Sequence, residues 1–501
     1  MQAIPFLHAG LESSRIGVNL NPSPLADPRM IMPYQFPLLP AVLTVFLYLS
    51  SANASCLAAE PERETWRIAE MFEVEPVWSG HRVGMSLLTA EDRQYVAYYD
   101  ADRRMSVASR ALGSDEWQIK KLPTSVGWDS HNSVTMALDR DGNLHVSGNM
   151  HCVPLIYFRT TTPGDVSTLT QFTSMVGDHE KRCTYPHFLY GNDGELIYIY
   201  RDGGSGNGMR LWNVYDETTR AWRRLIDTPV FSGEGKRNAY YVGPVRDAKG
   251  TYHMVWVWRD TPDCATNHDL SYARTDDLTH WTKSDGTPLE LPMTLDTAEI
   301  VDPVPVKGGL INGNTKIGFD KEGRGVLSYH KYDAEGKTQI YNAWLEEKGW
   351  AIYRTTDWDY RWEFSGGGCI GFEVSVGPVQ VDALGRLVQH YRNPEEGGLF
   401  ELDEETLKQL RPVQPTEPRM PPEITRKTST FPGMLVRVQS DLADSQGHSG
   451  RTSEDRSRYV LRWESRGVNR DRPFEGPIPP PSRLRVYKLI LGDGKVATEQ
   501  R

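Results

Sequence analysis

Titratable and cationic side chains concentrate between residues 128 and 241 of the 501-residue chain. Histidine and tyrosine transfer protons when their surroundings adjust their pKa values, and arginine binds a carboxylate through two parallel hydrogen bonds. A lone histidine more often satisfies hydrogen bonds in a core, Tyr185 precedes Pro186 and can cap a strand, and Arg201 can pair with Asp202. These residues can form one functional site only if the fold brings them close together. The candidates are His131, His151, Tyr185, Arg201, Tyr240 and Tyr241, with His145 and His187 left as structural residues.

Composition and missing motifs exclude several classes of protein. Hydrophobic residues make up 39% and charged residues 24% of the chain, as in globular proteins. The formal net charge of -10 disfavours nucleic acid as the main partner, although a local basic pocket can still bind an acidic small substrate. The glycine run 203–208 precedes no Lys-Ser/Thr pair and no evident helix, so it is not a phosphate loop. The sequence has no Ser-His-Asp elbow and no HExxH motif, which argues against a serine hydrolase and against a zincin metalloprotease.

An Asp/Gly turn followed by a short strand recurs along the chain. Clear copies occupy 139–148, 192–200, 247–258, 320–330 and 382–391, and a looser copy occupies 89–100. Their turn glycines are Gly142, Gly194, Gly250, Gly323 and Gly385, with spacings of 52, 56, 73 and 62 residues. A strand, a polar turn and a tryptophan follow several copies, at Trp117, Trp222, Trp281 and Trp350. Repeats of this length predict an all-β propeller, with a seventh sheet formed by the two ends of the repeat region. A β-sandwich rarely repeats so regularly, and solenoid repeats are shorter.

The ends of the chain differ from the repeats. Residues 1–54 read as an extension and a signal peptide, because the apolar run 38–49 precedes small residues, and cleavage is expected after Ala54. We therefore expect a secreted or periplasmic protein; a lipoprotein attached through Cys56 is less favoured, because Asn53 stands where an aliphatic residue is preferred. The propeller is expected over 60–410, with a short helix at 404–410. Residues 411–501 form a Pro-rich, polar tail whose strand candidates, 434–439, 459–465 and 484–491, close the ring or pack on it.

The remaining global signals concern membranes, disulfides and assembly. No other segment approaches about 20 apolar residues, so no membrane span is expected. Five cysteines are too few for a disulfide scaffold; Cys152 and Cys183 are a conceivable pair, and buried thiols are slightly favoured. The sequence carries no signal for an oligomeric state.

Several segments together resemble a known family. SHNSVTMALDRDGNLHVSGNMHCVPLIYFR (130–159), TYPHFL (184–189), YRDGGSGNG (200–208), RNAYY (237–241) and WRDTPDCATNHDLSYA (258–273) are similar to the BNR-4 repeat proteins, and within them to the seven-bladed ulvan lyases. The likeness spans roughly 65–410 and implies a propeller polysaccharide lyase. It places the family's two site histidines at His131 and His151, its catalytic tyrosine at Tyr185 and its arginine at Arg201. A further site tyrosine falls on Tyr240 or Tyr241, with Tyr240 preferred.

These residue types suit β-elimination across C4–C5 of a 4-linked uronate. The carboxylate must be neutralised, which Arg201 could do, while a base removes the C5 proton and an acid protonates the leaving O4. Tyr185 can act as the base only beside a positive charge, since its ordinary pKa is about 10. His131 is the competing base, and His151 would neutralise the carboxylate or orient the sugar. This chemistry requires no metal cofactor.

A structural zinc or calcium ion is a separate expectation. His253, Cys264 and His268, with Asp260 or Asp263 nearby, offer the mixed N/S ligands that suit zinc. The spacing of 11 and then 4 residues matches no standard finger, and hydrogen bonds that brace a blade turn explain Asn267-His268-Asp269 as well.

The leading hypothesis is an exported polysaccharide lyase acting on an acidic, sulfated, ulvan-like glycan. A glycan-binding propeller without catalysis is the alternative, since the same aromatic residues can form a sugar platform. A sialidase-like glycoside hydrolase ranks last, because the required arginine triad is not evident.

Overall fold

The computed structural model describes residues 63–442 and 456–492. Contacts divide the chain into Met1–Glu60 and Pro61–Arg501, and every described residue belongs to the second unit. The expected signal peptide, its cleavage after Ala54 and the acylation of Cys56 lie outside the described residues. Across the described part of the chain, no helix is both long and apolar enough to cross a bilayer.

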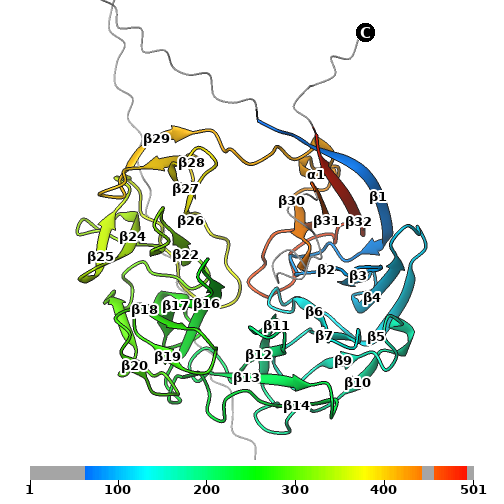
Figure 1. The fold of residues 1–501 in the computed structure, drawn as a ribbon. Coiled ribbons are helices and arrows are strands. Elements are labelled where there is room, and N and C mark those ends of the chain that lie inside the picture. Colours follow the sequence, from blue (N-terminus) through cyan, green and yellow to red (C-terminus); the bar gives the residue numbers. More distant parts are fainter. Residues whose placement is uncertain (1–62, 443–455, 493–501) are drawn as a thin grey trace, which may run out of the picture. The chain divides into compact units, whose positions relative to one another are not determined.

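Seven antiparallel sheets follow one another around a ring within the second unit, and Figure 1 views them along the ring axis. The all-β, seven-bladed propeller expected from the repeats is thereby confirmed. In the first six blades, each Asp/Gly copy contains the turn of a hairpin in its sheet and all or part of the strand that follows the turn.

The first three blades contain β2–β15. Blade 1 consists of β2 (Ser86–Thr89), β3 (Arg93–Tyr99), β4 (Arg104–Ala111) and β5 (Gln118–Ser125). Blade 2 consists of β6 (Val134–Leu138), β7 (Leu144–Gly148), β9 (Tyr157–Arg159) and β10 (Thr170–Phe172), with the 3-10 turn η1 (Val166–Thr168) before β10. Blade 3 consists of β8 (His151–Val153), β11 (Cys183–Tyr190), β12 (Leu196–Asp202), β13 (Met209–Asp216), β14 (Ala221–Arg224) and β15 (Phe231–Ser232).

The next three blades contain β16–β29. Blade 4 consists of β16 (Asn238–Arg246), β17 (Tyr252–Arg259), β18 (Asn267–Thr275), β19 (Trp281–Thr282), β20 (Pro288–Leu289) and β21 (Glu299–Asp302), with η2 (Cys264–Thr266) before β18. Blade 5 consists of β22 (Lys316–Phe319), β23 (Gly325–Tyr332), β24 (Thr338–Glu346) and β25 (Gly349–Arg354). Blade 6 consists of β26 (Ser375–Val381), β27 (Leu387–Arg392), β28 (Gly397–Leu402) and β29 (Gln409–Val413).

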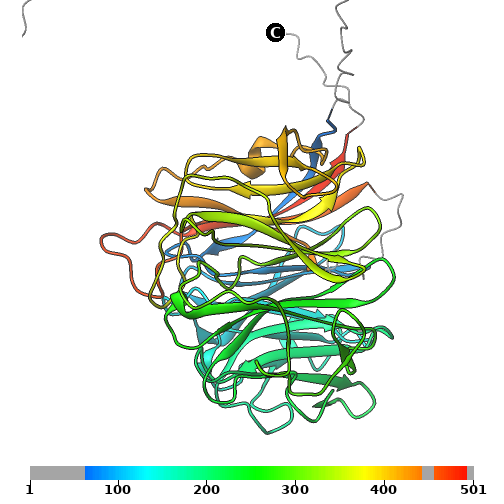
Figure 2. The ribbon, with the colours of Figure 1, turned by 90° about the vertical axis from the view of Figure 1, so that its left-hand side faces the viewer.

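Blade 7 joins the two ends of the described chain. Its order is β1-β32-β31-β30, so the first strand pairs antiparallel with the last. The one-turn helix α1 (Pro422–Thr425) packs beside it through Ile424. Between β31 and β32, the segment 467–481 reaches toward the ring centre in Figure 1 and extends beyond the strands in the side view of Figure 2. The blade's strands are β1 (Trp66–Val77), β30 (Met434–Ser440), β31 (Ser457–Arg466) and β32 (Ser482–Leu491).

The recurring turns have a common construction. In the turn 139–143, Gly142 N–H donates to Asp139 O at 3.0 Å, and Asn143 N–H donates to Asp139 Oδ1 at 2.7 Å. The glycines of the five clear copies all have φ between 75° and 96°, which side chains disfavour. The backbone thus favours glycine in all five turns, and an aspartate three residues earlier accepts the glycine N–H in four of them.

Neighbouring blades bury their faces against each other. One apolar cluster joins blades 7, 1 and 2, and others join blades 2 and 3, 3 and 4, 4 and 5, and 5 and 6. Trp222 of blade 3, for example, is 7% exposed and donates from Nε1 to Tyr157 Oη of blade 2 at 3.1 Å. A blade cannot bury both faces alone, so this packing is what makes the repeat stable.

The helix expected at 404–410 is wrong. Residues 404–406 form a turn, Leu407 has a φ of 50°, and β29 begins at Gln409. The bonds that Asp403 accepts from Thr406 N–H at 2.8 Å and from Leu407 N–H at 2.9 Å are those of a single capped helical turn. The turn is not continued, because Leu407 adopts the left-handed conformation and Asp403 N–H donates to Lys408 O at 2.9 Å, which closes the connection between β28 and β29.

Candidate active site

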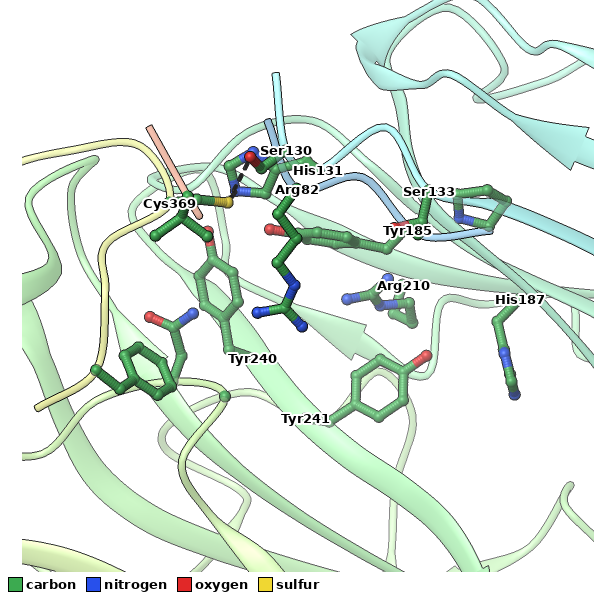
Figure 3. A pocket seen from close by; sticks show the side chains of 16 residues that line it. Arg82, Ser130, His131, Ser133, Tyr185, His187, Arg210, Tyr240, Tyr241 and Cys369 are labelled. Atoms are coloured by element: carbon green, nitrogen blue, oxygen red, sulfur yellow. Dashed lines mark hydrogen bonds between the residues drawn. The ribbon is translucent and has the colours of Figure 1, made fainter. Parts of the chain in front are cut away.

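A cavity of about 590 Å³ lies where loops and inner strands of several blades converge. Figure 3 shows Arg82, Tyr185, Arg210, Tyr240 and Tyr241 gathered around one space, with His187 at its edge. The lining combines strands of blades 3 and 4 with the segments before β2, β6 and β22 and with two long connections, which contribute Cys369 and Val468. The labelled residues that line it are Arg82, Ser130, His131, Ser133, Tyr185, His187, Arg210, Tyr240, Tyr241 and Cys369.

The two predicted histidines form a pair held by one carboxylate. Asp129 accepts from His131 Nδ1 at 2.7 Å through Oδ1 and from His151 Nδ1 at 2.5 Å through Oδ2. The two rings lie 4.1 Å apart between centroids. A second carboxylate, Asp471 from the segment between β31 and β32, approaches His131 Nδ1 to 3.2 Å. His131 Nε2 faces Cys369 Sγ at 3.4 Å.

This environment keeps His131 protonated near neutrality. Burial alone would lower its pKa, but the hydrogen bonds to Asp129 and Asp471 outweigh burial and raise the pKa well above 6.5. The pKa of Asp129 is correspondingly held well below its usual range, against the effect of burial, by its bonds to His131 and His151. A raised pKa favours the imidazolium form, which cannot accept a proton, so these surroundings do not favour His131 as a base.

Tyr185 projects into the cavity from a strained backbone. It lies in β11 with a φ of 56°, a conformation that side chains rarely adopt, and the register of β11 with β12 shifts at this point. Its ring is 5.8 Å from that of His131 and 6.4 Å from that of Tyr240. Burial and the neighbouring Tyr240 raise the pKa of Tyr185, while His131 and Arg201 oppose the rise.

Arg201 is beneath the cavity rather than in its lining. The side chain is 0% exposed. Nε donates to Gly203 O at 3.1 Å, Nη1 donates to Tyr240 Oη at 3.3 Å, and Nη2 donates to Thr184 Oγ1 at 3.2 Å. The expected grip of this guanidinium on a substrate carboxylate does not fit such burial. Its charge acts on the two phenols, with Cζ only 4.9 Å from the Tyr185 ring.

Tyr240 lines the cavity and has the opposite electrostatic surroundings to Tyr185. Burial raises its pKa, but the charges of Arg201 and Arg259 and a 2.8 Å hydrogen bond with Ser205 Oγ outweigh burial, so the pKa lies below 10. The glycine-rich run therefore has a purpose: it carries Ser205 to this phenol. Two titratable groups whose pKa values are pushed apart are typical of an acid and base pair.

Several residues of the site were not among the candidates predicted from the sequence. Asp129 precedes His131 by two residues and could have been noticed as an orienting carboxylate. Asp471 and Cys369 lie in connections outside the repeats, and nothing in the pattern marks them. Arg210, in β13 beside Tyr241, occupies a regular strand that reads as core, and its guanidinium lies 4.5 Å from the Tyr241 ring.

The residues of the expected metal site are not brought together. His253 is paired with Arg274, whereas His268 is paired with Trp258, so six residues, about 20 Å of strand, separate the two positions along β18. His253 instead bonds Tyr272 Oη and Asp247, and His268 bonds Asp260 and Asp269. Cys264 is a buried thiol at 3% exposure. The three side chains cannot share one ion, and hydrogen bonding accounts for both histidines.

Other residues singled out in the sequence have structural surroundings. His145 is fully buried between Asp139 and Tyr157 Oη. His187 contributes to the cavity wall. Cys152 and Cys183 are free thiols, and Cys183 is buried. Within 63–442 and 456–492, two groups of potential metal ligands are compact: Asp129, His131 and His151, and His131, Cys369 and Asp471.

Comparison with known proteins places the chain. Residues 93–358, more than half of the chain, match the BNR repeat-containing family. The chain belongs to that family.

Two curated relatives of this BNR repeat-containing chain are ulvan lyases. The long isoform of Glaciecola sp. is 27% identical over 136 residues, 19% of this chain and 14% of the relative. The short isoform of Alteromonas sp. is 28% identical over 163 residues, 29% of this chain and 28% of the relative. The matches thus span less than a third of either relative.

Solved structures share the propeller fold over a larger part of the BNR repeat-containing chain. The polysaccharide lyase Uly1 has a TM-score of 0.54 at 14% identity and covers 85% of this chain and 100% of its own. An ulvan lyase of polysaccharide lyase family PL25 has a TM-score of 0.52 at 11% identity, covering 84% and 95% respectively. The same enzyme has been solved bound to -[GlcA(1-4)Rha3S]-, with a TM-score of 0.50. At these identities the likeness establishes the fold.

Proposed function

We propose that this protein is an exported polysaccharide lyase that cleaves a 4-linked, uronate-containing, sulfated glycan of the ulvan type by β-elimination. The observation that carries the proposal is the pair of phenols, Tyr185 and Tyr240, which line one cavity with oppositely displaced pKa values beside a protonated His131. The similarity to curated ulvan lyases supports the reaction class.

In this proposal the two phenols divide the proton transfers. Tyr240, as phenolate, accepts the proton from C5; the C5–H electron pair becomes the C4–C5 double bond, and the C4–O4 bond breaks. Tyr185, whose raised pKa keeps it protonated, donates its proton to O4. The Tyr185 phenolate that results is stabilised by His131 and by Arg201. Proton exchange with water then resets both groups.

This assignment revises the roles expected from the sequence. Tyr185 becomes the acid rather than the base, because Tyr240 is the phenol next to Ser205 and two arginines. His131 acts as a fixed positive charge, and His151 completes the pair on Asp129. No step in the proposal passes through a metal ion.

Export belongs to the proposal as well. It rests on the apolar run 38–49 and the small residues that end at Ala54. A polymer as large as a cell-wall glycan is met outside the cytoplasm, so an exported enzyme and a glycan substrate are mutually consistent.

A digest of a panel of uronic-acid polysaccharides tests the proposal. The purified protein, incubated with ulvan, alginate, pectate and glycosaminoglycans, should produce the ultraviolet absorbance of unsaturated uronate ends from ulvan. If no glycan of the panel gives that absorbance, the lyase assignment is refuted. Binding of a glycan without any cleavage would instead support the glycan-binding propeller, and hydrolysis to saturated ends would support a glycoside hydrolase.

A further inference from the structure

Arg210 is a buried guanidinium with free donors. Its side chain is 4% exposed, and Nε and Nη1 have no hydrogen-bond partner among the described residues. Its recorded neighbours are aromatic: Cζ lies 4.5 Å from the Tyr241 ring and 5.8 Å from the Tyr185 ring. Burying a charge without a partner is unfavourable, so such a group is retained where a ligand supplies the partner.

Arg82 approaches the same space from the other side. It lies before β2, where its backbone N–H donates to Gly467 O at 3.2 Å. Figure 3 shows its guanidinium and that of Arg210 pointing into the space bounded by Tyr185, Tyr240 and Tyr241. The Arg82 side chain is exposed to the cavity.

The cavity offers these two cations no protein anion. None of its lining residues is an aspartate or a glutamate within the described ranges. The nearest carboxylates of the site, Asp129 and Asp471, bond the histidines. Arg201 already donates four hydrogen bonds to groups of the protein. An anion that enters the cavity therefore meets two unpaired guanidinium groups.

We propose that Arg210, with Arg82 opposite, binds an anionic substituent of the glycan, a carboxylate or a sulfate ester, and so supplies the counter-charge that Arg201 cannot supply. The inference deepens the proposed lyase function and rests on it. A planar guanidinium matches the geometry of both anions and can donate two parallel hydrogen bonds. Beside the reacting sugar, the same contact would offset the charge that develops on the carboxylate as C5 loses its proton.

Three variants test this role. Arg210→Met removes the charge, Arg210→Lys keeps it as a point charge, and Arg223→Met removes the same charge from the exposed outer strand β14 of the same blade. We expect Arg210→Met to lose about 100-fold or more in kcat/KM on ulvan, Arg210→Lys to recover part of the loss, and Arg223→Met to stay within about twofold. Because the free guanidinium is unpaired, Arg210→Met should melt at or above the wild-type temperature, which a structural role would not allow.

Desulfated ulvan distinguishes the two anions. If the partner is a sulfate ester, wild type and Arg210→Met should have equal kcat/KM on desulfated substrate; if it is the carboxylate, the loss should be the same on both substrates. Should Arg210→Met fail to fold, Arg210→Lys and Arg82→Met are assayed in the same way, and wild-type kcat/KM in both would overturn the inference.

The outcomes separate this inference from the lyase proposal. An active wild type with an equally active, folded Arg210→Met refutes the role of Arg210 and leaves the lyase function standing. If wild type cleaves nothing, the function fails, and calorimetric titration with glucuronate and with a sulfated monosaccharide takes over. Equal affinity of wild type and Arg210→Met for both ligands, or no binding to wild type, then refutes the anion site.

Discussion

Arg201 Nη1 donates a hydrogen bond to Tyr240 Oη over 3.3 Å. The arginine that the sequence singled out therefore acts on a phenol of the protein from below the cavity. Its positive charge favours the phenolate form of Tyr240, and Ser205 adds a second donor to the same oxygen at 2.8 Å. The activity of the site should consequently depend on how this one phenol titrates.

Removing the serine should move the pH profile. Ser205→Ala deletes one hydrogen bond to the phenolate, which raises the pKa of Tyr240 by up to about one unit. Because the base must be deprotonated, kcat/KM rises with pH through this pKa, and the rising limb should shift to higher pH. Activity at neutral pH should fall up to about 10-fold and recover in alkaline buffer. Ser133→Ala, at another serine of the cavity, should leave the profile in place.

Phenylalanine substitutions at Tyr240 and at Tyr241 should have very different effects on kcat. Tyr240→Phe removes the proposed base and should reduce kcat by about 100-fold to 10,000-fold, whereas Tyr241→Phe keeps the ring beside Arg210 and should cost less than about 10-fold. Initial rates on ulvan and circular dichroism spectra compare the two. Equal activity of both variants would argue against Tyr240 as the base.

Asp129→Asn should lower the pKa of His131. By NMR, wild-type His131 should show no titration between pH 5 and 8, and the variant should titrate at a lower pH than wild type, because one of the two carboxylates that raise its pKa is gone while Asp471 remains. The lowered pKa of Asp129 stabilises the fold above about pH 4, and this contribution is lost as the pH falls. The raised pKa of His131 contributes fully below about pH 6.5 and is lost as the pH rises toward its folded value.

The melting temperature of Asp129→Asn should accordingly lie furthest below wild type between about pH 4 and 6.5. Asp139→Asn is a control, since Asp139 pairs with the remote, buried His145 and should leave the His131 resonance unchanged. A His131 that titrates near 6.5 in wild type would contradict the carboxylate-held imidazolium.

Chelation should not reduce cleavage. The two carboxylates beside His131 favour its protonated form, and a protonated imidazole does not coordinate a metal. Dialysis against EDTA followed by assay should therefore leave kcat/KM unchanged. Loss of activity that zinc restores would show that Asp129, His131 and His151 bind an ion instead.

Gly318 tests how closely adjacent blades approach. A Cβ at this position in β22 would lie 1.9 Å from Val379 O in β26, so Gly318→Ala should destabilise the fold by about 2 kcal/mol or more. Gly325, in the neighbouring strand β23, has no atom within 4 Å of an added Cβ, and its alanine variant should melt close to wild type. Thermal melts compare the two; equal melting temperatures would mean that the blades can separate without cost.

The sequence was sufficient for the fold because its local rules agree with each other. A turn glycine at positive φ recurs in five blades, an aspartate precedes it by three residues in four of them, and a short apolar strand follows each turn. Each of these features can be recognised without tertiary information. The helix expected at 404–410 is replaced by the connection of a hairpin, because Asp403 N–H bonds Lys408 O and β29 pairs with β28, a pairing that the local pattern does not reveal.

The site was predictable where its residues lie at comparable strand ends of successive blades, as His131, Tyr185 and Tyr240 do. Arg210 could not be predicted as a site residue, because the sequence of its strand, MRLWNVYD, does not show whether a charged side chain faces the cavity. The position of His268 relative to His253 depends on strand register, which sequence spacing does not reveal.

Blade 7 makes the order of synthesis matter. Asp471, one of the two carboxylates on His131, arrives between the last two strands of the described chain, and β32 is the strand that clasps β1. A chain that stops after β31 lacks the pairing of β1 with β32 that closes the ring, and it lacks Asp471, the second carboxylate beside His131. Under the proposed lyase function, a chain that ends before β32 should therefore lack activity.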